Sequence, residues 1–345
     1  MASTYKHFLS SDATTTRTLL HESVPLTGTI VSGTYGGKTV ALGSEPHVKT
    51  FSHGMFQSVY DYPHLSSSAN HVFDVAVGAY DAKNVAAVTS QASKKANMYA
   101  QMAHVLVGPD VDGTIRRFDQ DGDLTAGTKH DQVVFLNLSR LLVKDEIKKG
   151  SFSIQIATGS AFANAAKTAV RTIKDTGAAS SYKTNSPAGE YGILYAQSTK
   201  VGLVYYQAGV VVLTGSAFGN GIMFSGGAAS GKFAGAITGS TINTISNGVR
   251  NRIANISFNN TTELNSTVYF CRSNHNEFNY SSNVTYLSGS QIRVKGDNAA
   301  TAPRTYITTV GLYSADNELL AVAKLSEPLR KDPTNELTLR VRLDY

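Results

Sequence analysis

Three aspartates at alternate positions, Asp119, Asp121 and Asp123, form the strongest metal-binding pattern in the sequence. Carboxylates at the first, third and fifth positions open a common type of calcium-binding loop. That loop also needs glycine at its sixth position and a bidentate glutamate at its twelfth, where this chain has Leu124 and His130. Two interpretations stay open: a looser calcium site built by the three aspartates, or an acidic hairpin turn, which is favoured.

A glycine-rich stretch that ends in lysine, Gly226–Lys232, matches the first seven positions of a phosphate-binding loop. Phe233 follows, where such a loop needs a hydroxyl group to ligate magnesium. The surrounding sequence is rich in Gly, Ala and Ser, and such a composition produces matches of this kind without a phosphate site. We therefore predict that no nucleotide binds here.

Residue types suited to acid–base, nucleophilic or zinc chemistry are present but scattered. The nine histidines form no HxH or HExxH pair, which would place two zinc ligands together. No GxSxG elbow presents a serine nucleophile. Asp74, Asp81, Glu190 and Glu263 could be paired as acid and base only with distances that a sequence does not give. We predict a protein that is not an enzyme and that uses no cofactor.

The composition is that of a folded chain with a thinly spread positive charge. Of 345 residues 16% are charged, and the formal net charge is +6. The densest basic cluster, Lys144–Lys149, also contains acids, so neither a basic face nor a nucleic-acid-binding module is recognisable. No stretch has the length and apolarity of a transmembrane helix, and the start of the chain does not resemble a signal peptide. We predict no nucleic-acid partner, no membrane insertion and synthesis in a cytoplasm.

Abundant Tyr, Phe, Ser and Thr favour strands over helices. The expected fold class is mainly β with a few helices (α+β), in which antiparallel sheets form β-sandwich-like domains with long Gly/Ser-rich loops. Three segments are expected: an N-terminal β-rich domain at 1–150, a middle region with variable Gly/Ala-rich loops and a helix at 151–255, and a C-terminal antiparallel β platform at 256–345. A single interleaved unit is the alternative to this division.

Apolar residues near 3.6-residue spacing predict helices at 92–107 and 240–256, and a shorter one at 138–147. A strongly apolar run at 202–213 is predicted to be one strand that is covered on both faces. Its apolar part, Val204–Leu213, is either an interaction surface or, in preference, intrachain core.

The last forty residues predict three strands. The first two, 306–313 and 318–325, flank the polar turn Ser314–Asn317, whose Asp and Asn side chains suit tight turns. The third, 336–345, alternates strictly between apolar and polar residues, which is typical of a strand with one buried face.

Large apolar, aromatic and arginine side chains of these strands, with two aromatic residues of the loop 278–283, are the expected interface residues, because such side chains dominate protein interfaces. They are Tyr306, Leu312, Tyr313, Leu337, Leu339, Arg340, Val341, Arg342, Leu343, Tyr345, Phe278 and Tyr280.

The segment Ile307–Ala323, ITTVGLYSADNELLAVA, resembles the hairpin T-x-GLY/F-D-x-x-G/N-x-LIAVA of tail, baseplate and fibre-attachment proteins of tailed phages. Further blocks are similar to virion proteins of contractile-tailed phages, particularly marine cyanophage-like myoviruses. They are Tyr5–Asp12 with Thr16–Glu22, Ser139–Gly150, Asn185–Gly192 and Ile256–Leu264. The resemblance is to virion structural proteins and extends over nearly the full length of the chain.

This resemblance implies a non-enzymatic structural subunit of a phage virion, preferentially in the tail baseplate, that acts through protein–protein interfaces. It implies partners among other tail and baseplate proteins and copies of the chain itself, contact with a host surface as a further option, and localisation in the virion tail. Two alternatives stay open. One is a tail-fibre adaptor or a receptor- or glycan-binding module, suggested by the loop 278–283, and the other is a neck or collar component. The family supplies no catalytic residues.

Overall fold

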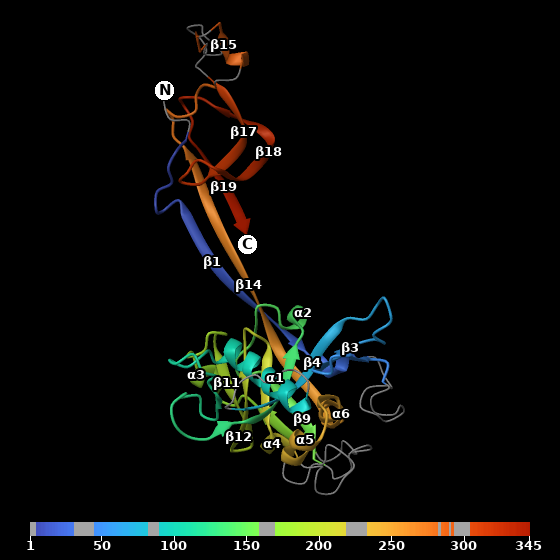
Figure 1. Cartoon of the computed structure of the whole chain (residues 1–345). Helices are drawn as coiled ribbons and strands as arrows, with labels where there is room; N and C mark the ends of the chain where they lie inside the picture. Colours follow the sequence, from blue (N-terminus) through green and yellow to red (C-terminus); the bar gives the residue numbers. More distant parts are fainter. Residues whose placement is uncertain are drawn as a thin grey trace. The chain divides into compact units, whose positions relative to one another are not determined.

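A computed structural model gives the fold, and the chain divides into two compact units (Figure 1). Unit 1 consists of Met1–Leu19 and Glu263–Tyr345, and unit 2 consists of Leu20–Thr262. The structure describes residues 5–30, 45–81, 90–158, 170–218, 233–281, 284–289, 291–292 and 304–345. The glycine-rich match at Gly226–Lys232 lies outside these ranges.

Two long strands, β1 (Ala13–Val24) and β14 (Ile253–Ser273), contain the boundaries between the units. The other strands of unit 2 are β2 Val48–Thr50, β3 Phe56–Tyr60, β4 His71–Ala79, β5 Phe118–Asp119, β6 Lys129–His130, β7 Gln132–Leu138, β8 Glu146–Ile147, β9 Ser153–Ala157, β10 Val170–Lys174, β11 Tyr191–Ala196, β12 Thr199–Tyr205 and β13 Val210–Thr214. Its helices are the 3-10 turn η1 Leu26–Thr29 and α1 Gln91–Leu106, α2 Arg140–Val143, α3 Ala178–Ser181, α4 Gly215–Phe218, α5 Phe233–Gly239 and α6 Ile242–Arg252.

Unit 2 is built on one large antiparallel sheet. From the unit 2 part of β14, the strand order is β14-β9-β10-β11-β12-β13-β7-β4-β3-β2. The described chain is mostly strand with a few helices, so the predicted class, mainly β with antiparallel sheets, is confirmed.

Both faces of this sheet are covered. At its centre, β13 and β7 pair Val211 with Leu136 and, one residue on, Val212 with Phe135. The first pair belongs to a first hydrophobic cluster and the second pair to a second cluster. Successive residues of a strand point to opposite faces, so the two clusters lie on the two faces. Helix α6 contributes to the first cluster and α1 to the second. The two helices therefore cover opposite faces.

The apolar run at 202–213 is a hairpin and not the single strand that its composition predicts. Strands β12 and β13 pair with Gly202 opposite Leu213 and Tyr205 opposite Val210. The chain turns at Gly209, whose φ of +68° is the left-handed region that favours glycine. The prediction that both faces are covered is confirmed, because the apolar residues of both strands are buried in the two clusters. The alternative of an interaction surface at Val204–Leu213 is therefore wrong.

The helix predictions are confirmed in different degrees. Helix α1 matches the predicted helix at 92–107 and is capped by Ser90, whose side chain accepts the Ser93 N–H. The predicted helix at 240–256 ends earlier, at Arg252, and Ile253 begins β14. Ile253 is buried like the apolar face of α6, so a helical stripe and a buried strand look alike here. At 138–147 only the single turn α2 forms.

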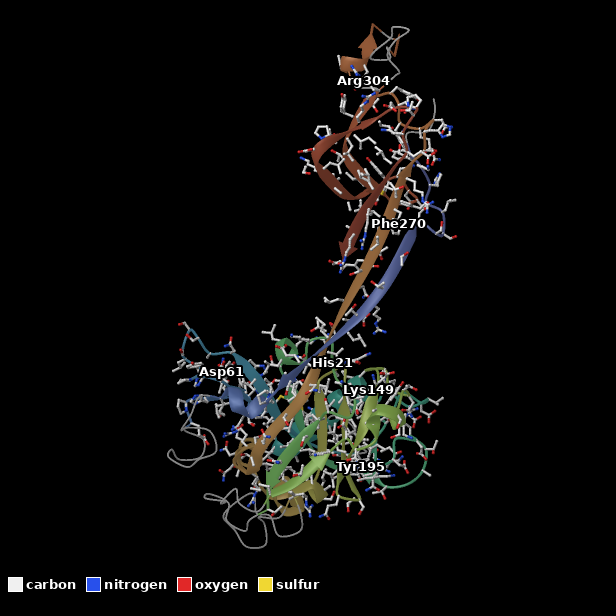
Figure 2. All side chains as sticks on the ribbon, turned by 180° about the vertical axis from the view of Figure 1, so that it is seen from behind. His21, Asp61, Lys149, Tyr195, Phe270 and Arg304 are labelled. Carbon is white, nitrogen blue, oxygen red and sulfur yellow. The ribbon has the colours of Figure 1, made fainter. Side chains whose placement is uncertain are left out.

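Unit 1 contains the 3-10 turn η2 (Val284–Tyr286) and strands β15 Leu287–Ser288, β16 Gln291–Ile292, β17 Thr305–Tyr313, β18 Leu319–Lys331 and β19 Leu337–Asp344. The predicted C-terminal hairpin is confirmed as β17 and β18, and its turn places Asn317 at a φ of +63°. The third strand also forms, but β19 pairs with β14, from Ser266 opposite Asp344 to Ser273 opposite Leu337. Phe270 of β14, labelled in Figure 2, donates its backbone N–H to the Asp12 carbonyl at 2.8 Å.

The division into units differs from the three consecutive segments expected from sequence. The first nineteen residues belong with the C-terminal segment, and the residues between them form one unit without a boundary near 150. Sequence reasoning had no signal for this, because the pairing of β1 with β14 joins strands that are far apart in the chain.

Candidate functional site

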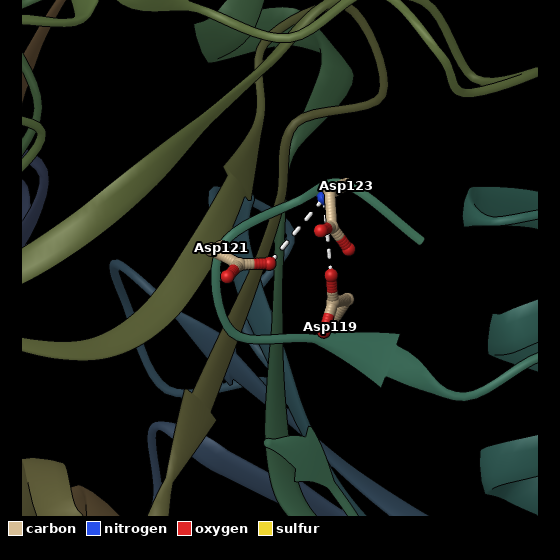
Figure 3. A group of neighbouring side chains, drawn as sticks. All are labelled: Asp119, Asp121 and Asp123. Atoms are coloured by element: carbon tan, nitrogen blue, oxygen red, sulfur yellow. Dashed lines mark hydrogen bonds between the residues drawn. The ribbon is translucent and has the colours of Figure 1, made fainter. Parts of the chain in front are cut away.

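The three aspartates of the calcium-like pattern lie at a narrow hairpin of unit 2. Strands β5 and β6 pair with Phe118 opposite His130 and Asp119 opposite Lys129. Asp119 ends the first strand, and Asp121 and Asp123 lie in the loop that follows (Figure 3). The favoured interpretation, an acidic hairpin turn, agrees with this placement.

Asp119 organises the loop through hydrogen bonds to its buried carboxylate. Its Oδ2 accepts the backbone N–H groups of Asp123 and Leu124, each at 3.0 Å. Its Oδ1 accepts the Gln120 N–H at 3.0 Å and the Lys129 ammonium at 2.9 Å. Burial disfavours ionisation of this carboxyl group, but the hydrogen bonds from Lys129 and from the loop hold its pKa well below the ordinary value.

The spacing of the three carboxylates would suit a calcium ion, but the loop already has an explanation without one. One oxygen from each of Asp119, Asp121 and Asp123 lies within 4.8 Å of the others, a separation that Ca²⁺–oxygen bonds of about 2.3–2.6 Å can span. However, both oxygens of Asp119 are used by the loop and by Lys129, which supplies the positive charge. The hydrogen-bonded turn therefore accounts for the pattern, and the looser calcium site stays a prediction.

His130, directly after the pair of Asp119 and Lys129, is a buried titratable group that sequence reasoning counted only as a mismatch. Its backbone carbonyl accepts the Tyr99 hydroxyl at 2.8 Å, and that hydroxyl accepts the Phe118 N–H at 3.1 Å. Burial lowers the pKa of the His130 imidazole to about 4, although Asp119 and Asp131 act in the opposite direction. The ring is neutral at pH 7, and its Nε2 has no hydrogen-bond partner among the described residues.

The scattered acids of the sequence have individual partners. Asp74 accepts the Ser58 hydroxyl at 2.6 Å and contacts His71 Nε2 at 2.7 Å, so the carboxylate lies between the serine and the histidine. A serine nucleophile needs the histidine in that middle position. Glu190 pairs with Lys149 at 2.5 Å, Lys149 being labelled in Figure 2, and Glu263 pairs with Arg17. Asp81 is exposed.

The predicted interface residues of unit 1 divide by burial. Leu312 and Val341 are buried, and Leu337, Leu339 and Leu343 are half-buried. The others are exposed: Tyr306, Tyr313, Arg340, Arg342, Tyr345, Phe278 and Tyr280. On β19 the arginines and leucines therefore point to opposite faces, as the alternation predicts.

The structure gathers one exposed apolar cluster that sequence reasoning recognised only in part. We call Tyr5, Tyr313, Leu319 and Val322 the hairpin patch, because the last three lie on β17 and β18. The rings of Tyr5 and Tyr313 meet edge to face with centroids 4.9 Å apart, and Tyr313 is opposite Leu319 in the strand register. Of these residues only Tyr313 was predicted. Tyr5 had no sequence signal, because it comes from the far end of the chain.

Comparison of the chain with protein-family models, with curated proteins and with solved structures gives no match. Among the helices of the described ranges, none combines the length and the apolarity needed to span a membrane.

Proposed function

We propose that this chain is a non-enzymatic structural subunit of the tail of a contractile-tailed bacteriophage, preferentially of the baseplate. The observation that carries the proposal is the exposed apolar surface of unit 1 on the hairpin β17–β18, whose sequence resembles a tail-protein hairpin. A structural subunit acts through such surfaces, with aromatic and arginine side chains as anchors.

The chemistry of unit 2 is compatible with this role. The Asp119 carboxylate of its acidic loop accepts hydrogen bonds from the loop backbone and from Lys129. Asp74 lies between Ser58 and His71, the position that the histidine occupies in a catalytic triad. Its sheet has a close-packed hydrophobic cluster on each face, which makes unit 2 a rigid scaffold.

Purified particles of the phage that encodes the chain test the proposal. Mass spectrometry should find the chain in intact virions, and cryo-electron microscopy should place density for its two units in the tail. Absence from purified particles contradicts the proposal. Density in the neck or collar, or in a fibre adaptor, supports a structural role and corrects only its position.

A receptor- or glycan-binding module is the second candidate, because two aromatic side chains of unit 1 are exposed. Phe278 and Tyr280 are 43% and 50% exposed. Exposed aromatic rings with polar neighbours can stack on sugar rings, although the same rings also suit a protein partner. A glycan array and a host-adsorption assay test this candidate. Signal that disappears in the variant Phe278→Ala/Tyr280→Ala supports it, and no signal above background contradicts it.

A further inference from the structure

Unit 1 has little apolar core of its own. Among its described residues the buried apolar side chains are Leu312 and Val341. Lys331, by contrast, is 0% exposed, and its ammonium donates to Asn279 Oδ1 at 2.9 Å and to the Asp332 carbonyl at 3.0 Å. A unit of about 100 residues normally depends on a hydrophobic core, disulfides, a metal or oligomerisation. The single cysteine, Cys271, cannot form a disulfide within the chain.

The hairpin patch supplies apolar surface of the kind that a core would bury. Tyr313, Leu319 and Val322 are 44%, 53% and 51% exposed. They gather around Gly311, which is opposite Val322 in the register. A Cβ at Gly311 would lie 2.9 Å from the Tyr313 ring and 3.2 Å from the Leu319 side chain, so the absence of a side chain lets these residues close over the strand. The side chains of the patch therefore pack against Gly311 on one side and are exposed to solvent on the other.

We infer that the hairpin patch binds unit 1 of a second copy of this chain, and that this contact completes the core of the unit. Tyr5 adds a further exposed ring to the patch, since it is 44% exposed and contacts Tyr313. Stable interfaces bury about 800 Å² on each partner. Interfaces between permanently associated subunits are the apolar ones, comparable to a core divided in two. The scarcity of buried apolar residues in unit 1 fits that class.

The charge of unit 1 favours a copy of itself over a charged partner. Of the 31 Lys and Arg and 25 Asp and Glu in the chain, 11 basic and 10 acidic residues fall in unit 1. The unit thus carries a formal +1 of the net +6, and unit 2 carries the remaining +5. Two nearly neutral surfaces do not repel each other, whereas nucleic acid or an anionic membrane would be attracted to a basic surface. Closed symmetric association of identical chains is also the commonest form of assembly.

A second copy of the chain is thus the partner of the hairpin patch, and the biological role of this contact rests on the proposed function. Sedimentation or light scattering of the purified full chain tests it. The wild type should be a symmetric oligomer at micromolar concentration. Leu319→Asp and Val322→Lys, which place a charge in the contact, should weaken self-association at least about a hundredfold. The matched control is Leu65→Asp, since Leu65 of unit 2 is 89% exposed and outside the patch. It should associate like the wild type.

Each outcome supports or overturns the inference. A wild type that stays monomeric up to about 100 μM, or patch variants that associate as the wild type does, overturns it. Circular dichroism of both patch variants checks the fold, and two substitutions of opposite charge guard against failure of either one. A monomeric chain that is nevertheless present in virions means that another tail protein covers the patch. A patch-dependent oligomer that is absent from virions leaves the inference intact and contradicts the proposed function.

Discussion

The two units of the chain distribute their apolar residues in opposite ways. Unit 2 places them in two clusters on the faces of one sheet, with Phe73, Phe135 and Val212 fully or almost fully buried. Unit 1 is the smaller unit, yet it holds most of the large apolar side chains that are exposed among the described residues, including Leu320 and Tyr345. One chain thus combines a unit that is complete in itself with a unit that has a partly open apolar surface.

The difference shows that β-strand content alone does not measure stability. A strand of unit 2 such as β13 is buried on both faces, whereas β18 alternates between exposed and half-buried residues. Apolar burial contributes roughly 25 cal/mol for each Å² removed from water. The same strand geometry therefore contributes much to the stability of unit 2 and little to that of an isolated unit 1.

The largest effect is expected from truncating the core of unit 2. Phe135→Ala removes a ring that packs against Phe118, with centroids 5.7 Å apart, and should lower the free energy of unfolding by about 3–5 kcal/mol. Leu320→Ala in unit 1 is the matched control, expected to change it by no more than about 0.5 kcal/mol in a dilute, monomeric sample. Urea unfolding followed by circular dichroism measures both. Equal losses would break the comparison between the units.

Acid should weaken unit 2 through His130. Burial lowers its folded-state pKa to about 4, from an ordinary value of 6.5, so the unfolded chain binds more protons between these two values. Stability is therefore fully present above pH 6.5 and falls as the pH decreases toward 4, by at most about 1.4 kcal/mol for each pH unit.

The variant His130→Leu should show a flatter dependence of the thermal midpoint on pH in this window. Burial raises the pKa of Asp175, which acts in the opposite direction, but this contribution is common to both proteins and cancels in the difference. Parallel pH profiles of the variant and the wild type would show that His130 is not the group that titrates.

Unit 1 should be sensitive to the loss of a polar group. Lys331→Met removes an ammonium that donates to the Asn279 side chain and to the carbonyls of His275 and Asp332. Hydrogen bonds to a charged group contribute roughly 1.5–3 kcal/mol, so the opening free energy of β17 and β18 should fall by about that much. Hydrogen exchange of these strands measures the change, with the amides of β7 in unit 2 as the internal reference. Unchanged exchange in β17 and β18 would mean that the lysine is not part of the stability of unit 1.

The smallest effect is expected at an exposed ion pair. Arg342 and Asp344 lie 2.8 Å apart on β19, and both side chains are more than half exposed. Solvent screens such pairs, so Arg342→Ala should leave the thermal midpoint nearly unchanged. Thermal unfolding in low and high salt measures this contribution. A larger loss would indicate that Arg342 takes part in an interface, and the same measurement on Arg340→Ala would then separate a local contact from a general effect of charge.

Local patterns made part of the fold predictable. The β17–β18 hairpin follows from two apolar runs around the turn Ser314–Asn317, and α1 follows from its apolar spacing before Gly108. The turn at Gly209 was missed because the apolar residues on both sides of it are continuous, which hides a hairpin within what looks like one strand. Periodicity alone also could not distinguish the end of α6 from the start of β14.

The candidate sites were less predictable, because they depend on residues that are distant in sequence. The alternation of β19 correctly predicted that its arginines and its leucines point to opposite faces of the strand. The aspartate pattern correctly predicted a turn. The contact of Tyr5 with Tyr313 and the buried pair of Arg250 with Glu45 had no local signal. Contacts between residues that are distant in sequence can be predicted only when the topology of the chain is known.

The location of the unit boundaries inside β1 and β14 has a consequence for synthesis. Unit 2 occupies the middle of the sequence, so all of its residues are synthesised before Glu263. Domains fold as units during translation. Unit 2 can therefore fold before the first nineteen residues have the rest of unit 1 to pair with. Unit 1 closes only when β19, which follows all of unit 2 in the chain, pairs with β14. The apolar hairpin is synthesised after all of unit 2, so its surface becomes available for association only when the residues of unit 2 have already been made.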